Sequence, residues 1–248
     1  MAAKPITPIS PPPFNPFLPP GKEVRLPVCI GGTKGLDDEW KNHDGPFYEH
    51  LHNHSLQEAR LPFMYAMPRS TFYWCGQVDG LTGDNECWIG AAHNLEAHIY
   101  RCIAENALPE TVVVDFFCHS HGGNVFLEGI RRGILAREYI GNVFFFSTPL
   151  RPDLKETRTG LNYLKNGKAF YIHGGWKDRW EPRGRISLKR LWNSPWGVAW
   201  DLLASTKTMR EIPDSQNIID NSKGHSDTLN AEFMLEKVWP RFLEHQKK

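Results

Sequence analysis

The arrangement in the sequence best suited to chemistry is a serine flanked by two histidines and followed by two glycines, CHSHGG at 118–123. An apolar run of strand length precedes it at 112–118, and a helix-like segment follows from about 123 to 137. The pattern is G-x-S-x-G with Cys118 in place of the first glycine. In that motif the serine occupies a strained turn and its oxygen is exposed at the carboxyl end of a sheet. We therefore predict that Ser120 is a nucleophile.

A serine hydroxyl is a weak nucleophile at neutral pH, so it needs a histidine to take its proton and a carboxylate to orient that histidine. The backbone amide of His121 comes at the expected start of a helix, where partial positive charge favours an oxyanion. The predicted chemistry is attack of Ser120 on a carbonyl carbon, with the His121 amide as one oxyanion donor. The alternative is a serine that merely caps a helix in an ordinary loop.

Strand-like and helix-like segments alternate along the rest of the chain. Apolar or aromatic runs predict strands at 26–30, 71–75, 112–118, 142–147 and 169–173, with a weaker one at 216–220. In 87–106 the apolar residues recur at spacings of three and four, which is typical of a half-buried helix, and a last helix is expected from about 228. The alternation predicts an α/β fold with a mainly parallel sheet and helices on both faces.

Length and composition predict one large domain. The chain has 248 residues, of which 40% are hydrophobic and 23% charged. We place the domain at 22–248, behind an arm at 1–21 that has eight prolines in its first twenty positions and would form a surface strap or a docking peptide. The net charge of +1 gives no sign of a nucleic-acid partner, and no oligomeric state is predicted.

The cysteines and the N-terminal sequence bear on the compartment. Five cysteines, without CxxC spacing, favour reducing surroundings. Residues 1–20 contain no apolar core of a signal peptide, so a cytoplasmic location is expected, with export by another route left open. No run approaches the ~18 apolar residues of a transmembrane segment.

Five motifs together resemble the α/β-hydrolase superfamily, in particular lipase/esterase-like members with an HSHGGN nucleophile elbow. They are IGGT at 30–33, FYWCG at 72–76, HSHGGN at 119–124, FFFSTP at 144–149 and GHSD at 224–227. The resemblance covers nearly the whole chain after the arm, and it implies an α/β-hydrolase fold. It also implies a second oxyanion amide from the loop after an early strand. That loop is IGGT here, which nominates the Thr33 amide, with Gly32 next.

The resemblance further implies that an acid and then a histidine follow the serine in the chain. Two histidines lie between the elbow and the C-terminal tail. His173 falls inside an expected strand, whereas His225 lies in a loop between the last strand and the last helix, so His225 is the predicted base. Asp178 follows two glycines after the strand that ends at His173, and it is the predicted acid. Asp153, after the preceding strand, is the alternative.

Tryptophans are concentrated between the predicted acid and the predicted base. Insertions at this edge of a sheet usually lie over the active site, so we expect a lid or cap at 176–210. Trp176, Trp196 and Trp200 are predicted to line an apolar substrate pocket there, and core packing is the alternative.

Three histidines form the pattern H-x-H-x-H at His50, His52 and His54. On a strand these side chains would share a face and could bind a metal, as in a metal-dependent hydrolase. A polar loop is the favoured interpretation, and we predict neither a metal nor a cofactor.

The function predicted from these residues is hydrolysis of a small-molecule or lipid carboxylic ester through an acyl-enzyme. An amidase, a thioesterase or an acyltransferase would use the same three side chains. A binding protein that had lost activity would keep only the fold.

Overall fold

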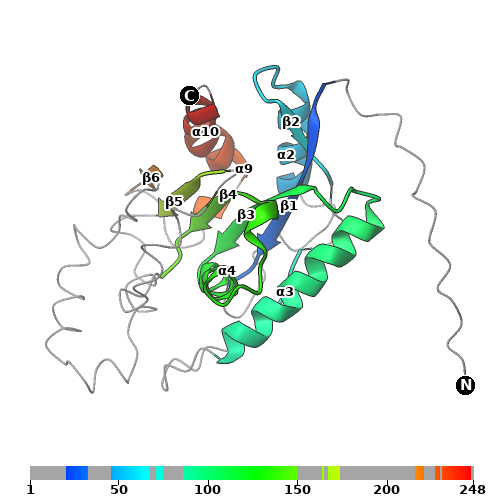
Figure 1. Ribbon diagram of the computed structural model, residues 1–248. Coiled ribbons are helices and arrows are strands. Elements are labelled where there is room, and N and C mark those ends of the chain that lie inside the picture. The colour runs from blue at the N-terminus through cyan, green and yellow to red at the C-terminus, as the bar shows by residue number, and fades with distance from the viewer. Residues whose placement is uncertain are drawn as a thin grey trace, which may run out of the picture.

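The computed structural model describes residues 21–32, 46–67, 71–74, 86–149, 164, 167–173, 216–220, 227–229 and 231–246. Their core is a six-stranded sheet in which every neighbouring pair is parallel (Figure 1). The sheet order is β2-β1-β3-β4-β5-β6. In chain order the strands are β1 (Glu23–Ile30), β2 (Phe63–Tyr65), β3 (Val113–His119), β4 (Ile140–Phe146), β5 (Ala169–His173) and β6 (Gln216–Ile219).

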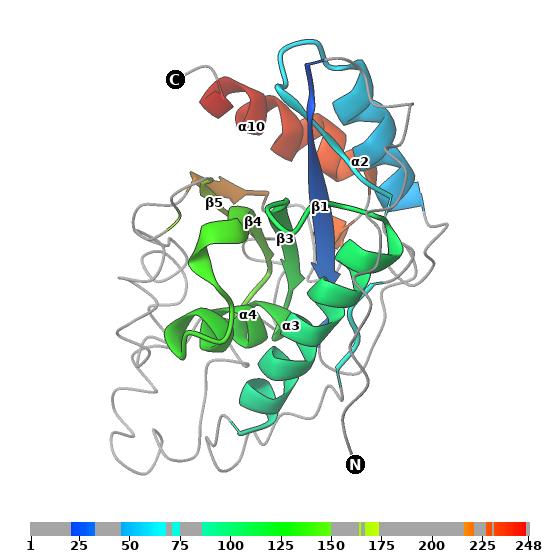
Figure 2. The ribbon, with the colours of Figure 1, turned by 45° about the vertical axis from the view of Figure 1, so that its right-hand side comes forward.

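Helices cover both faces of this sheet (Figure 2). On one face lie α3 (Glu86–Glu105) and α4 (Gly122–Arg131), and on the other lie α2 (Pro46–Gln57) and the C-terminal helices. The latter are α9 (Ala231–Phe233), a π-helical segment (Met234–Val238) and α10 (Trp239–Gln246). The predicted parallel α/β architecture is confirmed. No helix within the described ranges is long and apolar enough to span a membrane.

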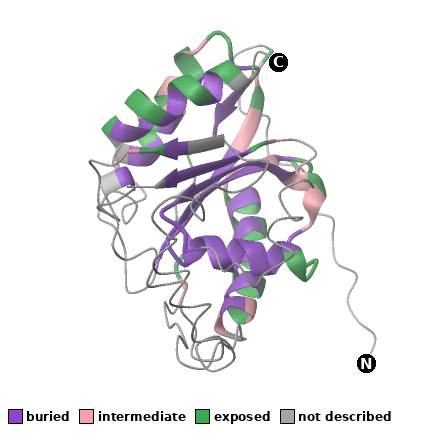
Figure 3. Cartoon of the chain, turned by 90° about the vertical axis from the view of Figure 1, so that its left-hand side faces the viewer, coloured by how far each residue is buried: buried purple, intermediate pink, exposed green. Residues whose placement is uncertain are grey.

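Two hydrophobic cores form because side chains of a strand alternate between the faces of the sheet. Phe116 of β3 packs with α3 and α4, whereas its neighbour Phe117 packs with α2 and α10. On the second face Phe117, Phe144 and Phe170 stack across three strands, with ring centroids 4.7 and 4.9 Å apart. All of β4 is buried, as expected for a strand covered on both sides (Figure 3).

The segment 71–75 does not form the predicted strand. Phe72 makes only an isolated bridge with Ile30, and Cys75 lies outside the described residues. The edge of the sheet is instead β2, whose three residues are too few to show a periodic pattern. The chain thus passes the end of β1 at Phe72 without adding a strand there.

The favoured polar loop at the H-x-H-x-H pattern is wrong, because these histidines lie on helix α2. The apolar residues Phe47, Tyr48 and Leu51 are spaced by helical intervals and are all buried. His52 contacts the carbonyl oxygen of Tyr65 through Nδ1 at 2.7 Å. A helix does not place three alternate residues on one face, so the strand geometry that suggested a metal site is absent from this described segment.

The helix after the elbow is shorter than the predicted 123–137, since α4 ends at Arg131. Gly133 adopts a left-handed conformation with φ +68°. The amides of Gly133 and Ile134 donate to the carbonyls of Ile130 and Gly129. This pair of hydrogen bonds is a Schellman motif, which ends the helix before the expected boundary.

A buried carboxylate on β3 connects this strand with β1, β2 and β4 in the half of the sheet where β3 begins. Asp115 is fully buried and accepts hydrogen bonds from Tyr65 Oη at 2.7 Å and from the Asn142 backbone and side chain at 2.6 and 3.0 Å. Arg25 Nη1 lies 3.4 Å from its Oδ1 atom. The network compensates for the loss of solvent around the charge.

Replacing Asp115 by leucine is therefore expected to lower the free energy of unfolding by about 3–5 kcal/mol, because the partly buried Arg25 and the buried Tyr65 and Asn142 donors lose their acceptor. Urea denaturation measures this effect. Glu105→Gln is the control, since it breaks an exposed pair with Arg101 and should change stability by about 0.5 kcal/mol or less. Equal effects of the two substitutions would contradict the structural role of the network.

Candidate active site

Ser120 lies in a sharp turn between β3 and α4. Its φ of +50° falls in the left-handed region, which costs a non-glycine residue on the order of 1–3 kcal/mol and is found mainly where surrounding structure enforces it. The Ser120 amide donates to the carbonyl oxygen of Phe146 at the end of β4, at 2.9 Å. The predicted strained turn between a strand and a helix is thus present in the structure.

Small residues allow the strands and helix to approach closely at this turn. A Cβ atom on Gly122 would lie 2.5 Å from the carbonyl oxygen of Ile30 and 2.6 Å from that of Gly31. A Cβ atom on Gly32 would lie 2.8 Å from the Ser120 Cβ atom. The first turn of α4 therefore packs directly on the end of β1, and the predicted oxyanion loop begins against Ser120.

Cys118, which replaces the first glycine of the motif, fits inside the core. It is fully buried beneath α3 and α4, and its backbone needs no positive φ. Burial raises the pKa of its thiol well above the usual value, which disfavours the reactive thiolate. Ser120, with 8% of its surface exposed, is the more accessible candidate nucleophile.

His121 is the N-cap residue of α4, with φ −65° and ψ −12°. Its ring stacks on Trp88 of α3 with centroids 5.6 Å apart and an interplanar angle of 26°. Its Nδ1 atom lies 3.1 Å from Nδ2 of Asn124. The backbone amide therefore lies at the positive end of the helix dipole, and the side chain is held on two sides.

The other strands reach the same edge as Ser120, because all six run in parallel. After β4, Ser147 has φ +48° and donates its amide to Ile172 of β5 at 2.7 Å. His173 ends β5, as its predicted strand position required, and β6 ends at Ile219. Ligands of parallel α/β sheets bind at this carboxyl edge.

Several predicted site residues lie outside the described residues: Thr33, Asp153, Trp176, Asp178, Trp196, Trp200 and His225. The described elements next to them are β5, which ends shortly before Asp178, and the short 3₁₀ helix Asp227–Leu229, which begins shortly after His225. Of the predicted residues, the structure brings together Ser120, His121 and Gly32.

Sequence reasoning missed three side chains around the elbow: Trp74, Trp88 and Asn124. Trp74 donates from Nε1 to the carbonyl oxygen of Gly31 at 2.7 Å. The sequence pattern predicts for Trp88 only a place on the apolar face of a half-buried helix. The contacts of the two tryptophans join segments far apart in the chain, so no local pattern could indicate them, whereas Asn124 contacts His121 within the HSHGGN motif.

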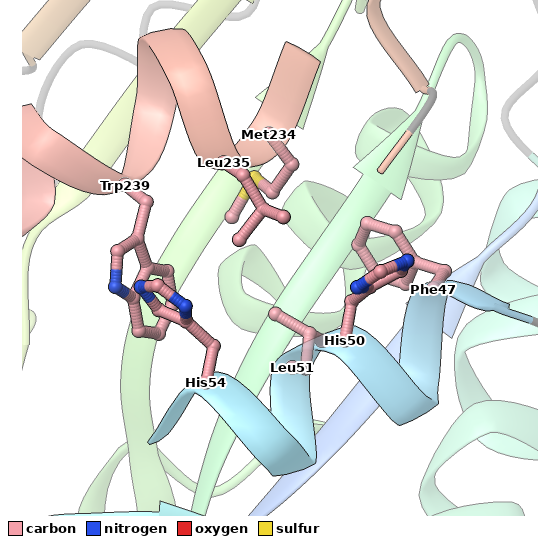
Figure 4. A pocket seen from close by; sticks show the side chains of 7 residues that line it. All are labelled: Phe47, His50, Leu51, His54, Met234, Leu235 and Trp239. Atoms are coloured by element: carbon pink, nitrogen blue, oxygen red, sulfur yellow. The ribbon is translucent and has the colours of Figure 1, made fainter. Parts of the chain in front are cut away.

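An apolar hollow lies on the opposite face of the sheet from α3 and α4, between α2 and the C-terminal helices (Figure 4). His54 packs edge-on against Trp239 there, with centroids 4.9 Å apart, and partial burial lowers the pKa of His54. The remaining lining residues are Phe47, His50, Leu51, Met234 and Leu235. None of the elbow residues contributes to it, so this hollow is separate from the Ser120 site.

No protein-family model matches the chain, and no curated protein matches it either. Similar solved structures include a dienelactone hydrolase-like promiscuous phosphotriesterase from metagenomic libraries. It is 15% identical, with a TM-score of 0.44 over 91% of this chain and 86% of that chain. Another is a lipase/esterase from Lactobacillus plantarum. It is 9% identical, with a TM-score of 0.40 over 94% of this chain and 89% of that chain. The parallel sheet, its helical cover and the strained serine between β3 and α4 are the features expected of an α/β-hydrolase fold.

Proposed function

We propose that this protein is a serine hydrolase that cleaves carboxylic esters, with Ser120 as its nucleophile. The observation that carries the proposal is the left-handed conformation of Ser120 between a buried strand and a helix. A serine that only capped α4 would not require this strain, since N-cap residues normally adopt extended backbone angles. Strained residues of this kind cluster at active sites.

In the proposed reaction His225 takes the Ser120 proton as Oγ attacks the ester carbonyl. The amides of His121 and Thr33, or Gly32 in place of Thr33, bind the oxyanion. Asp178 holds the imidazole in the required tautomer, with Asp153 as the alternative acid. Protonated His225 then gives its proton to the leaving alcohol. Water attacks the acyl-enzyme by the same route, which releases the acid and restores Ser120.

A panel of esters, thioesters and amides with matched acyl groups tests this function on the purified protein. We expect the esters to be hydrolysed with the highest kcat/KM, and Ser120→Ala to reduce the rate to the buffer background. If amides or thioesters were turned over with a higher kcat/KM than the esters, the proposed substrate class would be wrong. Absence of turnover on every class, or full activity in Ser120→Ala, would contradict the hydrolase proposal.

We further propose that Trp196 and Trp200 line the acyl pocket, with Trp176 beside them. Each aromatic side chain that contacts an acyl chain contributes on the order of 1 kcal/mol, so Trp196→Ala or Trp200→Ala should raise KM for long-chain esters roughly fivefold. Acetate esters provide the comparison, since they are too short to reach such a wall. Equal effects on both chain lengths, with a lower Tm, would instead indicate core packing.

A further inference from the structure

Trp74 contacts the backbone segment that begins the proposed oxyanion loop. Its Nε1 donates to the Gly31 carbonyl oxygen at 2.7 Å. The segment that carries Trp74 is attached to β1 at Phe72. The Phe72 amide donates to the carbonyl oxygen of Cys29 at 3.1 Å, and Phe72 forms an isolated parallel β-bridge with Ile30. The Gly31 carbonyl also faces Gly122, where a Cβ atom would approach it to 2.6 Å. Two elements outside the loop therefore fix this one carbonyl.

Fixing that carbonyl also fixes an amide. The Gly31 carbonyl and the Gly32 N–H belong to the same planar peptide unit, in which a trans bond directs them oppositely. Consecutive glycines have the greatest backbone freedom of any pair, so without an external contact this peptide plane would rotate readily. The Trp74 hydrogen bond restrains that rotation beside Ser120.

Trp88 holds the other proposed oxyanion segment by a different contact. It stacks on the His121 ring from α3, across 33 positions of sequence. Asn124 Nδ2 lies 3.1 Å from His121 Nδ1 and 3.4 Å from the carbonyl oxygen of Pro149. Because that carbonyl only accepts, the amide group of Asn124 donates on this side, and His121 Nδ1 is its acceptor. The ring is thereby locked next to its own backbone amide.

We propose that Trp74 and Trp88 are positioning residues for the oxyanion hole. Trp74 orients the Gly31–Gly32 peptide, and Trp88 holds the His121 residue whose amide is the second donor. The inference rests on the proposed serine-hydrolase function. Oxyanion donors act by being fixed before charge develops, so loosening them weakens binding of the transition state more than binding of the substrate.

Trp74→Phe tests the first part because it keeps an aromatic ring and removes the N–H donor. We expect kcat to fall on the order of 10- to 100-fold, with KM changed less than twofold. The Ki of phenylboronic acid, which forms a tetrahedral adduct with an active-site serine, should rise by the same factor as kcat/KM falls. Each rate is divided by the concentration of active sites, which is measured by titration with a fluorophosphonate. A smaller fraction of folded protein in a variant therefore does not lower its kcat.

Trp88→Ala tests the second part in the same assay. In the double variant, the fold decreases in kcat caused by Trp88→Ala and Trp74→Phe should multiply. Trp239→Phe is the control, because Trp239 is a buried tryptophan on the opposite face of the sheet. It should lower Tm and leave kcat per titrated site unchanged.

Unchanged kcat per titrated site in Trp74→Phe and Trp88→Ala would overturn the positioning role while the serine-hydrolase function stood. So would a purely KM effect, or a Ki for phenylboronic acid that stayed constant. A wild-type protein that the fluorophosphonate does not label would remove the proposed function and this inference together.

Discussion

Asp178→Asn is expected to lower kcat about 10⁴-fold while leaving the fold intact. Asparagine keeps the size of the side chain but offers an N–H group where the proposed mechanism needs an acceptor. His225 would then be held in the tautomer that cannot take the Ser120 proton. Steady-state kinetics measure the loss, and an unchanged Tm shows that it is chemical.

Asp153→Asn is the matched control, since Asp153 is the competing acid after the neighbouring strand. We expect this substitution to change kcat less than threefold. If Asp153→Asn were the crippling change and Asp178→Asn nearly silent, the acid would follow β4 and not β5, and the assignment of Asp178 would be wrong.

Gly122→Ala is expected to have the second large effect, because the new methyl group would meet backbone and not a mobile side chain. It would lie 2.5 Å from the Ile30 carbonyl oxygen and 2.6 Å from that of Gly31. Helix α4 must therefore move away from β1 and take Ser120 with it. We expect a loss of about 3 kcal/mol in the free energy of unfolding, and a fall in kcat/KM on the order of 100-fold.

Gly90→Ala is the control for Gly122→Ala, and it is expected to change the free energy of unfolding in the opposite direction. Gly90 lies on the exposed side of α3, and a Cβ atom there meets nothing within 4 Å. Because alanine favours a helix over glycine, this substitution should stabilise the protein by about 0.5–1 kcal/mol with no change in kcat/KM. Similar losses in both variants would show that the close approach at Gly122 has no special role.

The strands of the central sheet were predictable because burial on both faces leaves a continuous apolar signal. The runs at 112–118 and 142–147 became β3 and β4, which are buried almost throughout. The same reasoning failed at β2, which is short, and at α2, where polar histidines interrupt the apolar stripe. Local composition describes a loop there, whereas packing against the sheet selects a helix.

The elbow was also predictable, since a strained turn needs a particular order of residue types within a few positions. The side chains that support it were not. Trp74 and Trp88 were expected only to fill a strand and a helix face, and their contacts with Gly31 and His121 depend on how α3 and β1 pack. Such contacts follow from tertiary structure, which a periodic pattern does not encode.

Covalent labelling of Ser120 is the most direct test of the central claim. The purified wild-type protein is treated with a fluorophosphonate probe, digested, and mapped by mass spectrometry. We expect one adduct per chain, on the peptide that contains Ser120, and none in Ser120→Ala. A folded wild-type protein that stays unlabelled, or equal labelling of Ser120→Ala, would contradict a nucleophilic role for Ser120.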